Sequence, residues 1–124
     1  MDSPFPPPTA ASPAASPHRA PYEALVAAVL AWKNPDLEPR DHEQIALQLT
    51  GHARAVAAGV RDYAAALLKS DGRGALAEVV LREARSRLSA PLEGTARCAR
   101  NRARLVRALY MRLDRLTEPL PAAP

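Results

Sequence analysis

The stretch that decides the fold is residues 39–67, PRDHEQIALQLTGHARAVAAGVRDYAAAL. Its first residue, Pro39, suits the opening turn of a helix, and Asp41 and Glu43 follow where the helix dipole favours negative charge. Apolar side chains then recur in steps of three and four over about six turns, which predicts one long amphipathic helix. The stripe consists of Ile45, Leu49, His52, Val56, Val60, Tyr63 and Leu67.

The same spacing predicts three more helices, and no stretch shows the alternation of a strand. A short first helix is expected from Pro21 to the break at Asn34-Pro35. A turn at residues 70–74, SDGRG, precedes a third helix over residues 75–89, and Thr95 caps a fourth over residues 95–117. Their apolar faces carry Tyr22, Leu25, Val26, Val29, Leu30 and Trp32 in the first, Leu76, Val80, Ala84 and Leu88 in the third, and Cys98, Leu105, Val106, Leu109, Leu113 and Leu116 in the fourth.

The predicted fold is all-α: an antiparallel three-helix bundle with an additional short N-terminal helix. We expect this domain to span residues 21–118. Residues 1–20 are rich in Pro, Ala and Ser and are predicted to be a disordered tail, because they bring almost nothing to bury. Their run of three prolines, residues 6–8, could also dock into an aromatic groove. Residues 119–124 are predicted to be a second disordered tail.

Composition places the 124-residue chain among proteins of one domain, with a net charge of +4. The single cysteine, Cys98, has no partner for a disulfide within the chain, which favours a reducing cytoplasm. Residues 1–20 lack the pattern of a secretory signal, and the longest apolar run, residues 24–32, is far shorter than the roughly 20 residues of a membrane-spanning helix. We therefore expect a cytoplasmic protein without a membrane segment.

The fourth helix carries a stripe of arginines within one narrow arc. Such a stripe can neutralise phosphates along a nucleic acid or contact base edges. The alternative is a solvated face opposite the apolar side, which is the commoner meaning of a charge row on a helix. The candidate face for a nucleic acid or a protein partner consists of Arg97, Arg100, Arg104, Arg107 and Arg115.

Two polar residues fall on apolar faces. Arg102 lies between Cys98 and Leu105, and because a buried guanidinium needs a partner, Glu83 of the third helix is the candidate for an ion pair or for one side of a polar pocket. His52 lies on the core side of the second helix and is expected to be a hydrogen-bonded core or boundary residue, because a lone histidine cannot build a metal site. The preceding Gly51 would let another backbone come close.

No catalytic constellation is recognisable in the sequence. The glycines at 72 and 74 lack the features of a phosphate loop, and His42-Glu43 lacks the second histidine of a zinc-protease helix, because residue 46 is alanine. The carboxylates are scattered singly. We therefore predict no catalytic residue, no cofactor and no metal ligand.

From Leu49 to Leu116 the chain resembles a domain-of-unknown-function family of small helical proteins from high-GC soil bacteria, often labelled natural product biosynthesis protein. The similarity rests on Gly51-His52 after Leu49, on Glu83-Ala84-Arg85 before Leu88, and on Ala103-Arg104 with Arg107 and Leu109. The resemblance implies a helical protein linked by genome context to biosynthesis, and it implies no catalytic residue.

These observations favour a non-catalytic helical interaction module, an accessory or regulatory protein that binds another protein through a helix face. The alternative is a nucleic-acid-binding regulator that uses the arginine stripe. A third reading is a small-molecule binder whose pocket surrounds Arg102, Glu83 and His52.

Overall fold

The computed structural model describes residues 19–118, and within that range it contains four α-helices and no strand. The helices are α1 (Arg19–Leu30), α2 (Pro39–Ala65), α3 (Gly72–Leu88) and α4 (Ala96–Thr117). The predicted all-α class is therefore confirmed. The predictions of disorder at residues 1–18 and 119–124, and of a docking role for the prolines at 6–8, lie outside the described residues.

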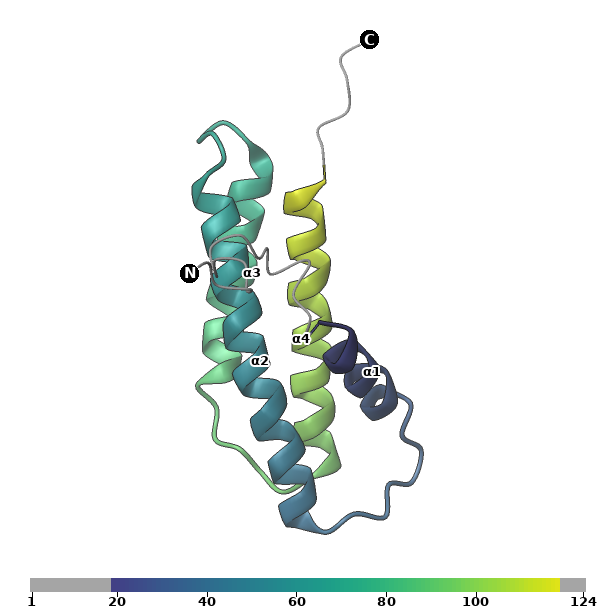
Figure 1. Cartoon of the computed structure of the whole chain (residues 1–124). Coiled ribbons are helices and arrows are strands. Elements are labelled where there is room, and N and C mark those ends of the chain that lie inside the picture. Colours follow the sequence, from purple (N-terminus) through teal and green to yellow (C-terminus); the bar gives the residue numbers. More distant parts are fainter. Residues whose placement is uncertain (1–18, 119–124) are drawn as a thin grey trace, which may run out of the picture.

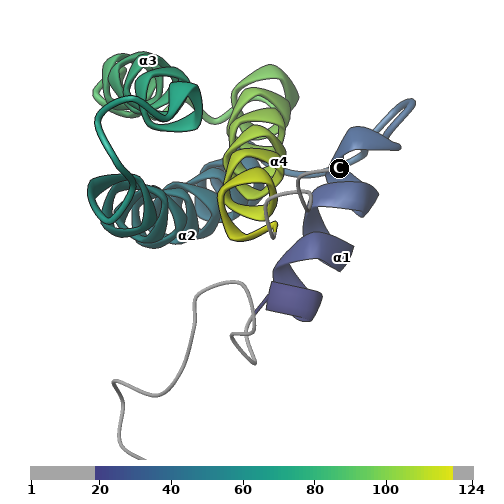
Figure 2. The same ribbon diagram turned by 90° about the horizontal axis from the view of Figure 1, so that it is seen from above.

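The two long helices α2 and α4 form the centre of the molecule. Figures 1 and 2 show α2, α3 and α4 side by side, with α3 running opposite to the other two, while α1 crosses α4 obliquely on the side away from α3. The buried side chains come mainly from α2 and α4, and the largest fully buried ones include Leu49, Leu109 and Leu113. Burying one such leucine stabilises the fold by roughly 1.5–3 kcal/mol.

The starts of two helices follow from their capping residues. The side chain of Thr95 accepts a hydrogen bond from the amide of Cys98 at 3.1 Å, as expected of the cap of α4. Asp71 caps α3 by accepting from the amide of Arg73 at 2.9 Å. The predicted turn at residues 70–74 was therefore too long, because α3 already begins at Gly72. Likewise α1 begins at Arg19, two residues before the expected start and inside the predicted tail.

The third helix meets the core through small side chains. Ala77 and Ala84 are buried completely or nearly so, and Leu88 closes the buried face at the end of the helix. Leu76, predicted to lie in the core, is 54% exposed. The reason is that the alanines let α3 approach closely along their own side of the helix, about 100° from Leu76 on the helical wheel.

One glycine is required by the packing of the loop before α4. A Cβ on Gly94 would lie 2.7 Å from the carbonyl oxygen of Pro39, at the start of α2. Gly51, predicted to admit another backbone, has nothing within 4 Å of its Cβ position, so that prediction was wrong. The close approach at Gly94 joins the beginnings of α2 and α4.

Candidate functional site

The arginine stripe of α4 lies largely in solvent. The helix contains seven arginines and one carboxylate, that of Asp114. Four of the five predicted stripe residues are exposed, namely Arg97, Arg104, Arg107 and Arg115. The fifth, Arg100, is half-buried and donates a hydrogen bond to the carbonyl of Trp32 at 2.6 Å, so it holds the chain just beyond α1. Together with the 61% exposed Met111, the four exposed arginines are called here the outward face of α4.

The positive charge on the outward face is not neutralised by neighbouring carboxylates. Among residues 19–118, none of its four arginines takes part in an ion pair. Arg104 donates to the side-chain oxygen of Asn101 at 3.1 Å, which is a neutral partner. Asp114 lies on the same helix but is engaged by Arg19. The outward face therefore presents a row of positive charge to an incoming partner.

An apolar groove runs beside this face, between α1 and α4. Its volume is about 630 Å³, and its charged lining residues are Arg19, Glu23, Arg107 and Asp114. Its floor is apolar and includes Val26, Leu30 and Met111. The groove thus places hydrophobic surface directly next to the arginines.

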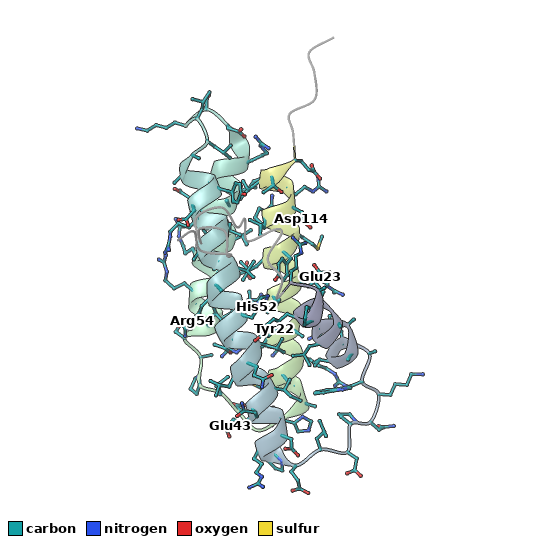
Figure 3. All side chains as sticks on the ribbon, viewed as in Figure 1. Tyr22, Glu23, Glu43, His52, Arg54 and Asp114 are labelled. Carbon is teal, nitrogen blue, oxygen red and sulfur yellow. The ribbon has the colours of Figure 1, made fainter. Side chains whose placement is uncertain are left out.

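A charged cluster fixes the start of α1 to α4. The guanidinium of Arg19 donates to both carboxylate oxygens of Asp114 at 2.8 and 2.7 Å, and to Glu23 at 2.5 Å. It also lies 4.2 Å from the ring centroid of Tyr110, at a distance typical of a cation–π contact. The bonds to Asp114 raise the pKa of Arg19, and those to Glu23 add to the effect. Figure 3 shows Asp114 and Glu23 on neighbouring helices at this point.

His52 connects the same cluster to α2. Its Nε2 is hydrogen-bonded to the hydroxyl of Tyr110, and its ring stacks on Tyr22 with a centroid distance of 3.8 Å and an interplanar angle of 7°. The histidine is half-buried, at the boundary between core and solvent. Burial also raises the pKa of Tyr110 above its ordinary value. Three helices therefore meet at one aromatic contact, which holds α1 in place. Figure 3 labels its members from α1 and α2, Tyr22 and His52.

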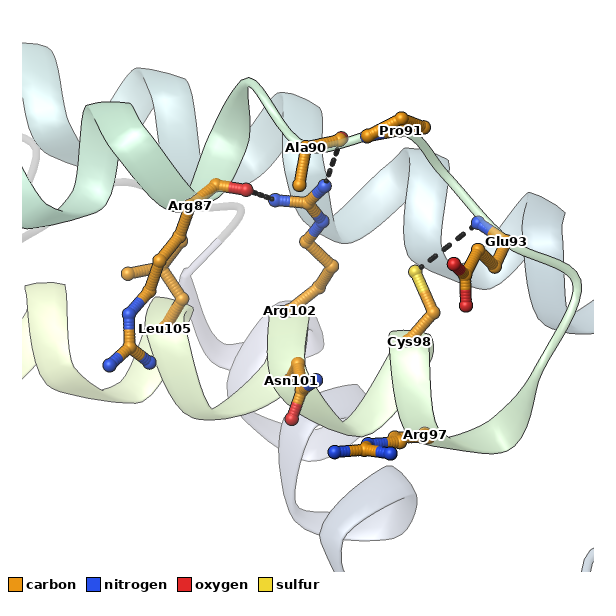
Figure 4. Close-up of a pocket in the computed structure, with 9 residues that line it drawn as sticks. All are labelled: Arg87, Ala90, Pro91, Glu93, Arg97, Cys98, Asn101, Arg102 and Leu105. Carbon is orange, nitrogen blue, oxygen red and sulfur yellow. Dashed lines mark hydrogen bonds between the residues drawn. The ribbon is translucent and has the colours of Figure 1, made fainter.

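Arg102 lies in the interior, but its predicted partner was wrong. The side chain is 5% exposed and donates to the carbonyls of Arg87 at 2.5 Å and Ala90 at 2.8 Å (Figure 4). Glu83 instead binds Arg87 at 2.6 Å on the exposed side of α3. The physical reason is that Arg102 lies level with the end of α3, where helix carbonyls have no intrahelical partner and accept its N–H groups.

Within residues 19–118, no group of three or more His, Cys, Asp or Glu side chains is placed to hold a metal ion. The thiol of Cys98 is half-buried and accepts a hydrogen bond from the amide of Glu93 at 3.4 Å. None of the helices in the described part of the chain is long and apolar enough to cross a membrane.

Sequence reasoning missed the cluster around Arg19. That residue was placed in the N-terminal tail, although Glu23 follows it at the spacing of a helical ion pair. Asp114 carried a second signal, because it is the single acidic residue of α4. The chain matches no protein-family model, no curated protein and no solved structure.

Proposed function

We propose that the protein is a non-catalytic helical interaction module that binds an acidic segment of another protein through the outward face of α4. The observation that carries the proposal is the row of exposed arginines without ion pairs within the described residues. Guanidinium groups bind carboxylates in a planar, two-bonded geometry, which suits Asp and Glu side chains of a partner.

The apolar groove favours a protein partner with a hydrophobic side. Met111 is 61% exposed between Arg107 and Arg115, and Leu30 continues the apolar surface toward α1. An amphipathic acidic segment would bury its apolar side chains in this groove while its carboxylates reach the arginines. A partner that offers only phosphate groups would bury no apolar surface against Met111.

The module is proposed to be a three-helix bundle, α2 to α4, to which α1 is added. Support comes from the packing of α2 on both α3 and α4, whereas α1 packs chiefly on α4. A cytoplasmic location is proposed from the single cysteine. A role as an accessory or regulatory protein linked to natural product biosynthesis stays a prediction from the sequence resemblance.

Nucleic-acid binding is the second candidate function. It is favoured by the extent of the charge, because residues 97–115 of a helix span about 27 Å at 1.5 Å per residue and could follow a phosphate backbone. The lone acid of α4 is held by Arg19 and would not repel phosphates strongly. The two candidates differ in whether Met111 takes part.

The experiment compares two probes, an acidic amphipathic helical peptide and a short DNA duplex, at equal ionic strength. The proposal expects the peptide to bind and the triple variant Arg104→Gln, Arg107→Gln, Arg115→Gln to weaken it at least about tenfold, since each charged contact contributes substantially. Met111→Gln should weaken the peptide too. The matched control replaces three exposed arginines on other faces, Arg40, Arg82 and Arg85, and should bind normally.

Two outcomes would contradict the proposal. Equal peptide binding by the triple variant and its control would remove the outward face as the site. DNA binding that depends on the three arginines, falls steeply with salt and ignores Met111→Gln would instead select the nucleic-acid function.

A further inference from the structure

A cavity separate from the α1–α4 groove lies at the other side of α4. It has a volume of about 500 Å³ and is bounded by the end of α3, the loop that follows it, and the first turns of α4 (Figure 4). Cys98 and Leu105 line it on α4, and Ala90 and Pro91 line it on the loop. Its charged and polar lining residues are Arg87, Glu93, Arg97, Asn101 and Arg102.

The positive charge of Arg102 at this cavity lacks a carboxylate. Its guanidinium donates hydrogen bonds to two backbone carbonyls, which are neutral groups. Glu83, the acidic side chain expected to balance it, is bound to Arg87. The partial negative charge at the end of α3 offsets only part of a full guanidinium charge. A guanidinium that is 5% exposed and forms no ion pair within the described residues is costly to keep buried.

The cavity lining as a whole carries a positive balance. Arg87 is paired with Glu83, so Arg97 and Arg102 stand against one carboxylate, that of Glu93, which is exposed and forms no ion pair within the described range. Arg97 also lies in the first turn of α4, whose positive dipole end favours an anion. Asn101 supplies an amide that can donate a hydrogen bond at the rim.

We propose that this cavity binds a phosphate group, either as the free anion or as the monoester of a small molecule. Guanidinium groups are suited to phosphate because their planar N–H pairs match its oxygens. Arg102 would supply positive charge from the buried wall of the cavity, while Arg97 and Arg87 would contact the ligand from its exposed rim. The partner-binding proposal does not require this cavity, so the two can fail separately.

The test is a titration of the isotopically labelled protein followed by NMR, in a buffer without phosphate. Inorganic phosphate and glycerol 3-phosphate are the two probes, with sodium chloride added to equal ionic strength as the blank. We expect chemical-shift changes that saturate with probe concentration and are confined to the amides of residues 87–102. Tighter binding of the ester would identify a phosphorylated small molecule, and equal binding would identify the free anion.

Variants at the rim keep the test independent of folding. The side chain of Arg97 is exposed, and Arg97→Gln should weaken binding about tenfold, the effect of one lost charged contact. Arg87→Gln should weaken it less, because Glu83 already binds Arg87. Arg115→Gln, on the same helix but outside the cavity, should leave the affinity unchanged. Shift changes that do not saturate, or an equal loss in Arg115→Gln, would overturn the proposal.

Discussion

The guanidinium of Arg19 donates hydrogen bonds to both carboxylate oxygens of Asp114, 95 residues away in sequence, at 2.8 and 2.7 Å. This contact fixes the start of α1, and the bond from Arg100 to the carbonyl of Trp32 fixes the chain just beyond its end. Because α1 forms one wall of the apolar groove, the two attachments also determine the shape of the proposed partner-binding surface.

Breaking the Arg19–Asp114 pair should loosen α1 without unfolding the bundle. We expect a double-mutant cycle of Arg19→Ala and Asp114→Ala to give a coupling energy of about 0.5–1 kcal/mol, because the half-exposed Asp114 is screened by water. The free energy of unfolding from urea titrations of the four proteins measures this coupling. Strictly additive effects would show that the pair contributes nothing to stability.

Arg102→Met should destabilise the fold even though it removes a buried charge. The carbonyl of Ala90 loses its donor, whereas the carbonyl of Arg87 keeps the amide of Ala90 at 3.2 Å. Losing hydrogen bonds from a charged group costs about 1.5–3 kcal/mol. Urea denaturation measures the change, with the exposed Arg104→Met as the control that should stay within about 0.5 kcal/mol of the parent. A stabilised Arg102→Met protein would mean that the carbonyl bonds do not repay the burial of the charge.

Two glycine substitutions should have opposite signs. Gly94→Ala places a methyl group 2.7 Å from the carbonyl oxygen of Pro39 and should lower the free energy of unfolding by about 1–3 kcal/mol. Gly51→Ala meets open space on a helix and should raise it by about 0.5–1 kcal/mol. Thermal unfolding of both variants provides the comparison, and a Gly94→Ala protein as stable as the parent would contradict the close approach.

Alkaline pH should release the aromatic contact at Tyr110. Burial raises the pKa of this phenol above its ordinary value of 10.0, so the neutral form stabilises the fold below that pH. This contribution is lost as the pH rises through the raised pKa of the folded state. Urea midpoints measured between about pH 9 and 11 should therefore fall faster for the parent than for Tyr110→Phe. Identical slopes for the two proteins would rule out this role of Tyr110.

The sequence predicted those features that depend on a single helix. The periodicity of residues 39–67 predicted α2, and Thr95 predicted the start of α4. The wheel of α4 also placed most of its arginines correctly on the solvent side. These are local properties, since the helical repeat fixes which side chains share a face.

Contacts between helices could not be predicted in the same way. The partners of Arg102 are backbone carbonyls, which carry no sequence signal, and they became available because α3 ends level with that side chain. Leu76 was assigned to the apolar face because it lies at helical spacing from Val80, whereas α3 packs through Ala77 and Ala84. Which face of a helix is buried depends on how closely its neighbour approaches, and small residues allow the closest approach.

The placement of α1 has a consequence for motion. The first helix packs chiefly on α4, whereas α2 packs on both α3 and α4. Helix α1 can therefore detach with less loss of buried surface than any other helix. Its amide hydrogens should therefore exchange with solvent through a local opening, well before those at the centre of α2 and α4. That opening would remove one wall of the groove beside the arginines, so the protein carries a surface that it can uncover without unfolding.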